Sequence, residues 1–175
     1  MRKIVIIING NGTVGKDTLC GFAGERYKVT SISAITPIKN IARQYGWNGE
    51  KDSKSRKFLA DLKKAFIEYN DLPFLFLTAE YEKFLHSDMC ILFVHIRERD
   101  EINKFKNHVK IPCITLLIRR DNLSEKWGND SDDQVENYTY DYIYHNNKSL
   151  SDAKDDFCTF VQTILTNTFN EEECC

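Results

Sequence analysis

Ile4-Val5-Ile6-Ile7-Ile8-Asn9-Gly10-Asn11-Gly12-Thr13-Val14-Gly15-Lys16-Asp17-Thr18 is the stretch that decides the fold we expect for this 175-residue chain. Its five leading β-branched residues are typical of a strand that is buried on both faces of a sheet. The glycines that follow match the pattern G-x-x-x-x-G-K, in which backbone N–H groups and a helix amino end converge on phosphate oxygens. In that pattern Lys16 supplies positive charge for the β- and γ-phosphates. We therefore expect a nucleotide-binding loop made of Gly10, Asn11, Gly12, Thr13, Val14, Gly15, Lys16, Asp17 and Thr18.

The rest of the chain alternates short apolar runs with segments of helical periodicity. Four further strands are predicted, over about 29–33, 89–94, 111–118 and 138–145. Helices are predicted over about 16–25, 36–45, 55–69, 98–107 and 151–168. One more helix is predicted after the break at 70–73 and ends at about 86. Strands that alternate with helices indicate an α/β protein with a parallel sheet. We expect one domain, residues 1–175, with three layers: a parallel five-stranded sheet and helices on both faces.

Composition narrows the function classes. The chain has 24 Lys and Arg against 26 Asp and Glu, which argues against nucleic acid as the main partner. No apolar run approaches the ~18 residues needed to cross a bilayer, so no membrane partner is expected. The apolar run near the amino end is too short for a signal peptide, so we expect a cytoplasmic protein. The six cysteines show no metal-ligand spacing and are interpreted as reduced thiols.

The ending Gly15-Lys16-Asp17-Thr18 resembles the phosphate loop of bacteriophage deoxynucleoside monophosphate kinases and related adenylate-kinase-like small kinases. Segments 46–62, 95–98 and 140–147 are similar to that group in kind and order. The resemblance implies a P-loop NTPase fold, ATP and Mg²⁺ as cofactors, and Thr18 as a Mg²⁺ ligand. It also implies acceptor-side helices over about 36–70 and a short lid over about 119–137.

One departure from this family concerns the metal site. The family carries an aspartate where this chain has His95, and that aspartate helps to hold Mg²⁺ through water. Glu98 is the nearest carboxylate on the same side of the sheet, so we expect Glu98 to take over. Alternatively, the metal rests on Thr18 and the nucleotide alone, or catalysis is weak. His95 itself is interpreted as a strand-end residue with satisfied contacts, rather than as a catalytic acid or base.

Asp17 is unusual, because a carboxylate beside phosphates should repel them. It can be tolerated if it points away from the phosphates or meets the metal through water. The residues leave this choice open.

Several arginines are placed where phosphoryl transfer needs positive charge. Arg97, Arg119 and Arg120 follow predicted strands and should lie at the carboxyl edge of the sheet, so we expect them, with Lys16, to be catalytic. Arg43 and Arg56 lie on the acceptor-side helices, and we expect them to bind the substrate together with Arg97. The alternative to substrate binding is that Arg43 and Arg56 lie on solvent-exposed helix faces and have no functional role.

The function we expect is ATP-dependent phosphoryl transfer to a small phosphorylated acceptor, most directly a nucleoside or deoxynucleoside monophosphate. One alternative is a kinase of another small metabolite. A second is a nucleotide-binding sensor without catalysis, which the missing strand-end aspartate favours. The expected partners are small-molecule nucleotides, and the expected assembly is a monomer or homodimer.

Overall fold

A computed structural model describes residues 2–50, 52–121 and 135–169 of the protein. Its strands are β1 (Ile4–Asn9), β2 (Val29–Ser33), β3 (Ile91–His95), β4 (Cys113–Arg119) and β5 (Tyr142–His145). They form one sheet in the order β2-β3-β1-β4-β5, and every neighbouring pair is parallel. The helices are α1 (Lys16–Arg26), α2 (Thr36–Gln44), α3 (Ser53–Asn70), α4 (Leu72–Leu85), α5 (Arg99–His108) and α7 (Leu150–Phe169), with the 3-10 turn η1 (Val135–Asn137). The predicted α/β class and the parallel five-stranded sheet are therefore confirmed.

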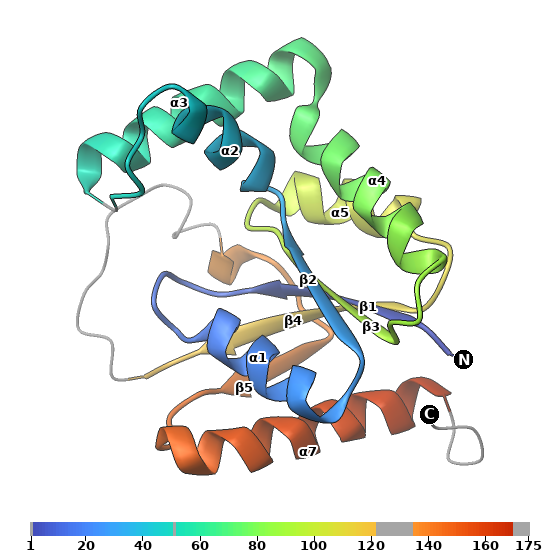
Figure 1. The fold of residues 1–175 in the computed structure, drawn as a ribbon. Helices are drawn as coiled ribbons and strands as arrows, with labels where there is room; N and C mark the ends of the chain where they lie inside the picture. The colour runs from blue at the N-terminus through green and yellow to red at the C-terminus, as the bar shows by residue number, and fades with distance from the viewer. Residues whose placement is uncertain (1, 51, 122–134, 170–175) are drawn as a thin grey trace.

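The central strand β1 separates two hydrophobic cores. All six of its residues are buried, and successive side chains point to opposite faces of the sheet. Ile4, Ile6 and Ile8 pack with α1 and α7, whereas Val5 and Ile7 pack with α4 and α5. Figure 1 shows α1 and α7 below the sheet and α4 and α5 above it. The continuous β-branched run is thus explained by helices on both faces.

The strand register gathers the carboxyl ends of three strands at one edge. Ile8 of β1 lies opposite His95 of β3, and Asn9 lies opposite Leu117 of β4. The loop after β1 therefore starts beside the ends of both neighbours. α2 and α3 extend beyond the sheet above this edge (Figure 1), and α3 contains no buried residue. Ligands of open parallel sheets bind at such an edge.

The strand predicted over 138–145 is shorter in the structure and begins at Tyr142. The Asp141 carboxylate accepts hydrogen bonds from the Thr115 backbone N–H at 2.8 Å and from its hydroxyl at 2.9 Å. These side-chain bonds take the place of ladder bonds between the strands. The rings of Tyr138 and Tyr140 pack edge to face, 4.9 Å apart. The alternating aromatics before Tyr142 thus reflect ring packing rather than strand pairing.

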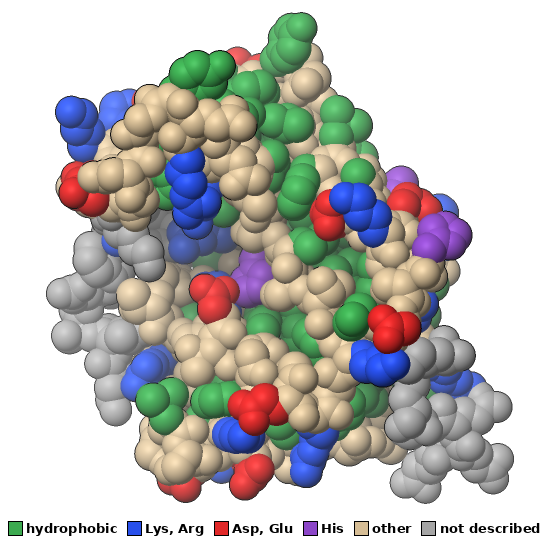
Figure 2. Space-filling model, viewed as in Figure 1, with side chains coloured by type: hydrophobic (Ala, Val, Ile, Leu, Met, Phe, Trp, Pro, Cys, Tyr) green, Lys and Arg blue, Asp and Glu red, His purple; other side chains and the backbone are tan. Residues whose placement is uncertain are grey.

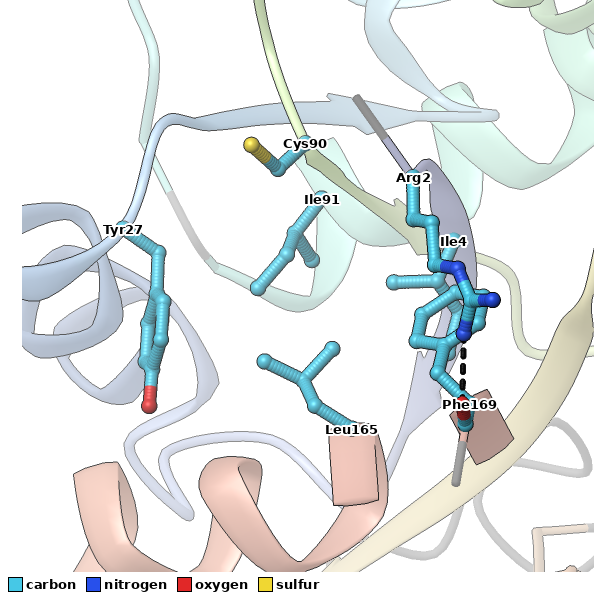
Figure 3. Close-up of a pocket in the computed structure, with 7 residues that line it drawn as sticks. All are labelled: Arg2, Ile4, Tyr27, Cys90, Ile91, Leu165 and Phe169. Atoms are coloured by element: carbon cyan, nitrogen blue, oxygen red, sulfur yellow. Dashed lines mark hydrogen bonds between the residues drawn. The ribbon is translucent and has the colours of Figure 1, made fainter. Parts of the chain in front are cut away.

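The amino edge of the sheet holds a small cavity of about 20 Å³ between the strands and the end of α7 (Figure 3). It is lined by Arg2, Ile4, Tyr27, Cys90, Ile91, Leu165 and Phe169. The Arg2 guanidinium donates a hydrogen bond to the Phe169 carbonyl at 2.5 Å and closes one side. A space of this size holds about one water molecule, so we place no ligand site there.

The cysteines in the described part of the chain form no disulfide. Cys20, Cys90 and Cys158 are buried and Cys113 is half-buried, while Cys174 and Cys175 lie outside the described residues. Burial raises the pKa of Cys20 to about 12, so its thiol stays protonated and unreactive at neutral pH. No helix among the described residues is long and apolar enough to cross a membrane.

Candidate functional site

The loop between β1 and α1 has the backbone that its glycines predict. Gly10 has φ +143°, and an added Cβ would lie 2.5 Å from the Ile118 carbonyl oxygen of β4. Gly15 has φ +92° and caps the start of α1 in the left-handed conformation. Gly15 supplies no side-chain cap at the start of α1, and the first-turn amides of a helix are suited to donate to an anion. Only glycine fits the close approach at Gly10, which explains the first position of the motif.

The Lys16 ammonium lies across this loop. Its Nζ donates to the Gly10 carbonyl at 2.5 Å and to the Asn11 carbonyl at 2.8 Å. The charge is thus held over the ring of backbone that the loop forms. A cation at this point, beside the amino end of α1, favours a phosphate group.

Two asparagines that our sequence analysis did not identify fix the loop in place. Asn146, directly after β5, is buried and donates from Nδ2 to the Val14 carbonyl at 2.8 Å. Its backbone N–H donates to the Arg119 carbonyl at 2.8 Å. Asn9 accepts from the Gly10 N–H at 2.8 Å and donates to the Arg97 carbonyl at 3.0 Å. The signal available in the sequence was a polar residue at the end of an apolar strand.

His95 ends β3 in a half-buried position beside α1. Its Nε2 lies 3.1 Å from the Ser31 hydroxyl and 3.9 Å from the Cys20 sulfur. Its Nδ1 lies 3.8 Å from the Asp17 carboxylate, which is longer than a hydrogen bond. Burial lowers the pKa of His95 to about 4; the Asp17 carboxylate opposes this shift, and the ammonium groups of Lys16 and Lys39 add to it. The ring is therefore neutral at pH 7, and its contacts agree with the predicted strand-end role.

Lys39 of α2 is a second cation near this edge that our sequence analysis did not single out. The signal available was its place on the first turns of the helix that follows β2. The same edge is hollowed in the space-filling view, below α2 and α3 and above α1, and basic side chains gather along the hollow (Figure 2). This is the charge that a polyphosphate requires.

Glu98, the expected metal ligand, lies in an ion cluster. Its carboxylate is 2.7 Å from the Lys63 ammonium of α3, and Lys63 also lies 2.8 Å from Glu101. Burial raises the pKa of Glu101 to about 7, with repulsion from Glu98 adding to the effect. Burial also acts to raise the pKa of Glu98, but the Lys63 ammonium outweighs it and holds that pKa below its usual value. The Glu98 carboxylate is therefore paired with Lys63 in this structure, and its expected role as a metal ligand stays a prediction.

The predicted arginines are distributed around the edge. Arg97 is exposed directly after β3, Arg119 is half-buried at the end of β4, and Arg120 is exposed. The Arg43 guanidinium lies over the Trp47 ring, 5.3 Å from its centroid. The Trp47 indole N–H is buried and has no hydrogen-bond partner among the described residues.

Arg56 is half-buried near the start of α3. Arg97, Arg119 and Arg120 thus lie at or just after the carboxyl ends of strands, whereas Arg43 lies on α2 and Arg56 on α3. Most of the predicted lid, 122–134, lies outside the described residues.

A cavity of about 190 Å³ lies between the end of α3, the start of α4 and the start of α5. Its walls are apolar apart from Asp71, Asp100, Glu101 and Lys104. Ala34, which also lines the cavity, donates its N–H to the His95 carbonyl at 3.1 Å. The cavity therefore lies next to the strand ends that adjoin the phosphate loop.

Comparison with known proteins supports the fold. No family model matches the chain, and no curated protein matches its sequence. Among solved structures, a shikimate kinase from Aquifex aeolicus is 13% identical, with 98% of this chain and 100% of that chain covered and a TM-score of 0.52. A gluconokinase from Sinorhizobium meliloti 1021 is 12% identical, with 98% of each chain covered and a TM-score of 0.52. A sugar kinase from Janibacter sp. HTCC2649 is 11% identical, with 93% and 95% covered and a TM-score of 0.52.

These similarities are low in sequence and extend over nearly the whole of each chain. They show that the chain has the fold of small P-loop kinases, which confirms the predicted fold class. The similar proteins named here are kinases of a sugar, gluconate and shikimate, so a nucleoside monophosphate acceptor remains a proposal.

Proposed function

We propose that this chain transfers the γ-phosphoryl group of ATP to a small acceptor. The observation that carries the proposal is the phosphate loop, with Lys16 across the loop and the amino end of α1 beside it. The acceptor oxygen attacks the γ-phosphorus while the bond to the β–γ bridging oxygen breaks, and ADP leaves. This chemistry needs positioning and neutralisation of charge rather than a covalent protein intermediate.

The chain's own residues divide this work. Lys16 and the loop amides hold the β- and γ-phosphates, and Asn146 and Asn9 keep the loop rigid. Arg97, with Arg119 or Arg120, neutralises charge at the transfer centre. Magnesium, when bound, neutralises charge on the β- and γ-oxygens. The hydroxyl and carboxylate oxygens in the first turn of α1 are the hard ligands that it prefers.

For the acceptor, we propose a nucleoside or deoxynucleoside monophosphate. Arg43 and Arg56 carry charge for its phosphate on the helices that extend past the sheet, and Arg97 approaches from β3. The Trp47 ring, which has Arg43 over one face, offers an aromatic surface on which the base of this acceptor would stack.

A second candidate acceptor is a hydroxylated metabolite without a phosphate. The cavity beside Ala34 favours it, because its acidic side chains would repel a phosphate and accept hydrogen bonds from hydroxyl groups. This acceptor would occupy the cavity between α3, α4 and α5 rather than the arginine side.

The test is an assay of ADP release over a panel of acceptors, with release in the absence of acceptor subtracted. The panel contains the nucleoside and deoxynucleoside monophosphates, simple sugars, gluconate and shikimate. We expect turnover with at least one monophosphate, abolished by Lys16→Ala. Turnover with a sugar or hydroxy acid alone would favour the second acceptor. Tight ATP binding without turnover on any acceptor would contradict the kinase function and leave a nucleotide-binding protein.

A further inference from the structure

A chain of hydrogen bonds joins three segments that adjoin the start of the phosphate loop. The Tyr140 hydroxyl donates to the Val135 carbonyl at 3.0 Å and accepts from the Asn9 side-chain amide at 2.7 Å. Asn9 Nδ2 also donates to the Arg97 carbonyl at 3.0 Å. The Asn9 side-chain oxygen accepts from the Gly10 N–H at 2.8 Å. Asn9 therefore ties the first glycine of the loop to the chain that follows β3, and Tyr140 holds Asn9.

The orientation of the Asn9 amide depends on the Tyr140 hydroxyl. Asn9 is 0% exposed, so its polar atoms need partners within the protein. Both hydrogens of Nδ2 and the side-chain oxygen have such partners. A tyrosine hydroxyl carries one proton, and here that proton is donated to Val135. The Tyr140 oxygen can therefore only accept from Asn9, which fixes the direction in which the amide faces.

Tyr140 is itself held firmly by its neighbours. Its ring packs edge to face on Tyr138, with the centroids 4.9 Å apart. The next residue, Asp141, accepts two hydrogen bonds from Thr115 of β4, and its own N–H donates to the Thr115 hydroxyl at 3.0 Å. The Lys106 ammonium of α5 lies 3.0 Å from the Asp141 carboxylate. The hydroxyl is thus fixed by packing and hydrogen bonds, as a residue that positions another must be.

We infer that Tyr140 is a positioning residue for phosphoryl transfer and acts through Asn9 on Arg97. Its hydroxyl orients the Asn9 amide, which holds the Arg97 backbone beside the start of the phosphate loop. Arg97 is one of the arginines proposed to neutralise charge at the transfer centre, where a misplacement of about 1 Å can cost about 10²-fold in rate. The inference rests on the proposed function, because it concerns the arrangement of charge for that reaction.

Tyr140→Phe removes the hydroxyl and keeps the ring. One Asn9 N–H then loses its acceptor at a buried site, so the amide turns and the Arg97 carbonyl loses its fixed donor. We expect kcat at saturating ATP and acceptor to fall about tenfold. Affinity for ATP should stay within about threefold, because loop carbonyls hold Lys16 and Asn146 holds the far side of the loop. Loss of ATP affinity together with kcat would show a general structural role and would overturn the inference.

Tyr138→Phe is the matched control, because it removes the hydroxyl of the neighbouring ring, which bonds to Asn103 at the surface at 3.3 Å. It should change neither kcat nor ATP affinity. A double-mutant cycle then tests the route through Arg97. In the Arg97→Ala background, with residual turnover followed by radiolabelled ATP, Tyr140→Phe should change kcat less than about twofold. Equal fold losses in both backgrounds would show that the hydroxyl does not act through Arg97.

Nuclear magnetic resonance of the nucleotide-free protein gives a readout that does not need the reaction. The Asn9 side-chain amide protons should exchange slowly with solvent in the parent and in Tyr138→Phe, and about tenfold faster or more in Tyr140→Phe. Unchanged exchange in Tyr140→Phe would overturn the inference. If the parent turns over an acceptor and Tyr140→Phe keeps kcat within about twofold, the inference alone fails. A parent that turns over no acceptor overturns the proposed function, and the inference falls with it.

Discussion

The free energy of unfolding of a Glu101→Gln variant, relative to that of the parent, should increase as the pH rises. Glu101 and Glu98 share the single ammonium of Lys63, whose side chain is only 13% exposed. Burial, and then repulsion from Glu98, raise the pKa of Glu101 from its usual 4.5 to about 7. A carboxyl with a raised pKa contributes stability at low pH, and this contribution is lost as the pH rises from 4.5 to 7.

The magnitude follows from this pKa. One pKa unit corresponds to about 1.36 kcal/mol, so the parent loses about 2.5 kcal/mol between pH 5 and pH 8.5 through this group. Glu101→Gln cannot lose this contribution. The free energy of unfolding of the variant, relative to the parent, should therefore increase by about 2.5 kcal/mol across that interval.

Denaturant unfolding at several pH values, followed by tryptophan fluorescence, provides the measurement. Glu98→Gln is the matched comparison, because the Lys63 ammonium holds the pKa of Glu98 below its usual value. Its stability relative to the parent should therefore fall, not increase, as the pH rises through the region of the carboxyl pKa values. A constant difference between Glu101→Gln and the parent from pH 5 to pH 8.5 would refute the account of this cluster.

Two further predictions concern the loop and the transfer centre. Gly10→Ala should lower the free energy of unfolding by about 2 kcal/mol or more, because φ +143° and a 2.5 Å approach to a carbonyl exclude a Cβ. At Gly21 an added Cβ meets nothing within 4 Å, so Gly21→Ala should raise the free energy of unfolding by up to about 1 kcal/mol. Thermal unfolding of both variants checks this, and similar melting temperatures would contradict it. At least one of Arg119→Ala and Arg120→Ala should lower turnover about 10³-fold while ATP binds within about tenfold; turnover within a few-fold of the parent in both would show that neither arginine acts at the transfer centre.

Sequence patterns predicted those helices, strands and loops whose determining residues lie within a few positions of one another. The β-branched run, the glycine spacing and Lys16 led to β1, the loop and α1 because backbone geometry and helix capping act over short separations. The ladder that places β1 between β3 and β4 could not be read directly, since strand order depends on contacts between distant segments.

The parts of the site that escaped prediction are side-chain contacts across long separations. Asn146 meets Val14 from 132 residues away, and Lys63 meets Glu98 from 35 residues away. In the sequence alone, Glu98 is an acid after a strand and is therefore a reasonable metal ligand. Only the position of α3, which carries Lys63, shows that this charge is already balanced.

The measurement that tests the central claim most directly is the thermal stability of the parent and of Lys16→Ala with saturating ATP and Mg²⁺. Ligand at about 100 times its dissociation constant adds about 2.7 kcal/mol of stability, which raises the melting temperature by roughly 5–10 °C for a chain of this size. We predict this shift for the parent and none for Lys16→Ala, with equal melting temperatures of the two proteins when no nucleotide is present. No shift in the parent, or the same shift in both proteins, would contradict the claim that this loop binds ATP through Lys16.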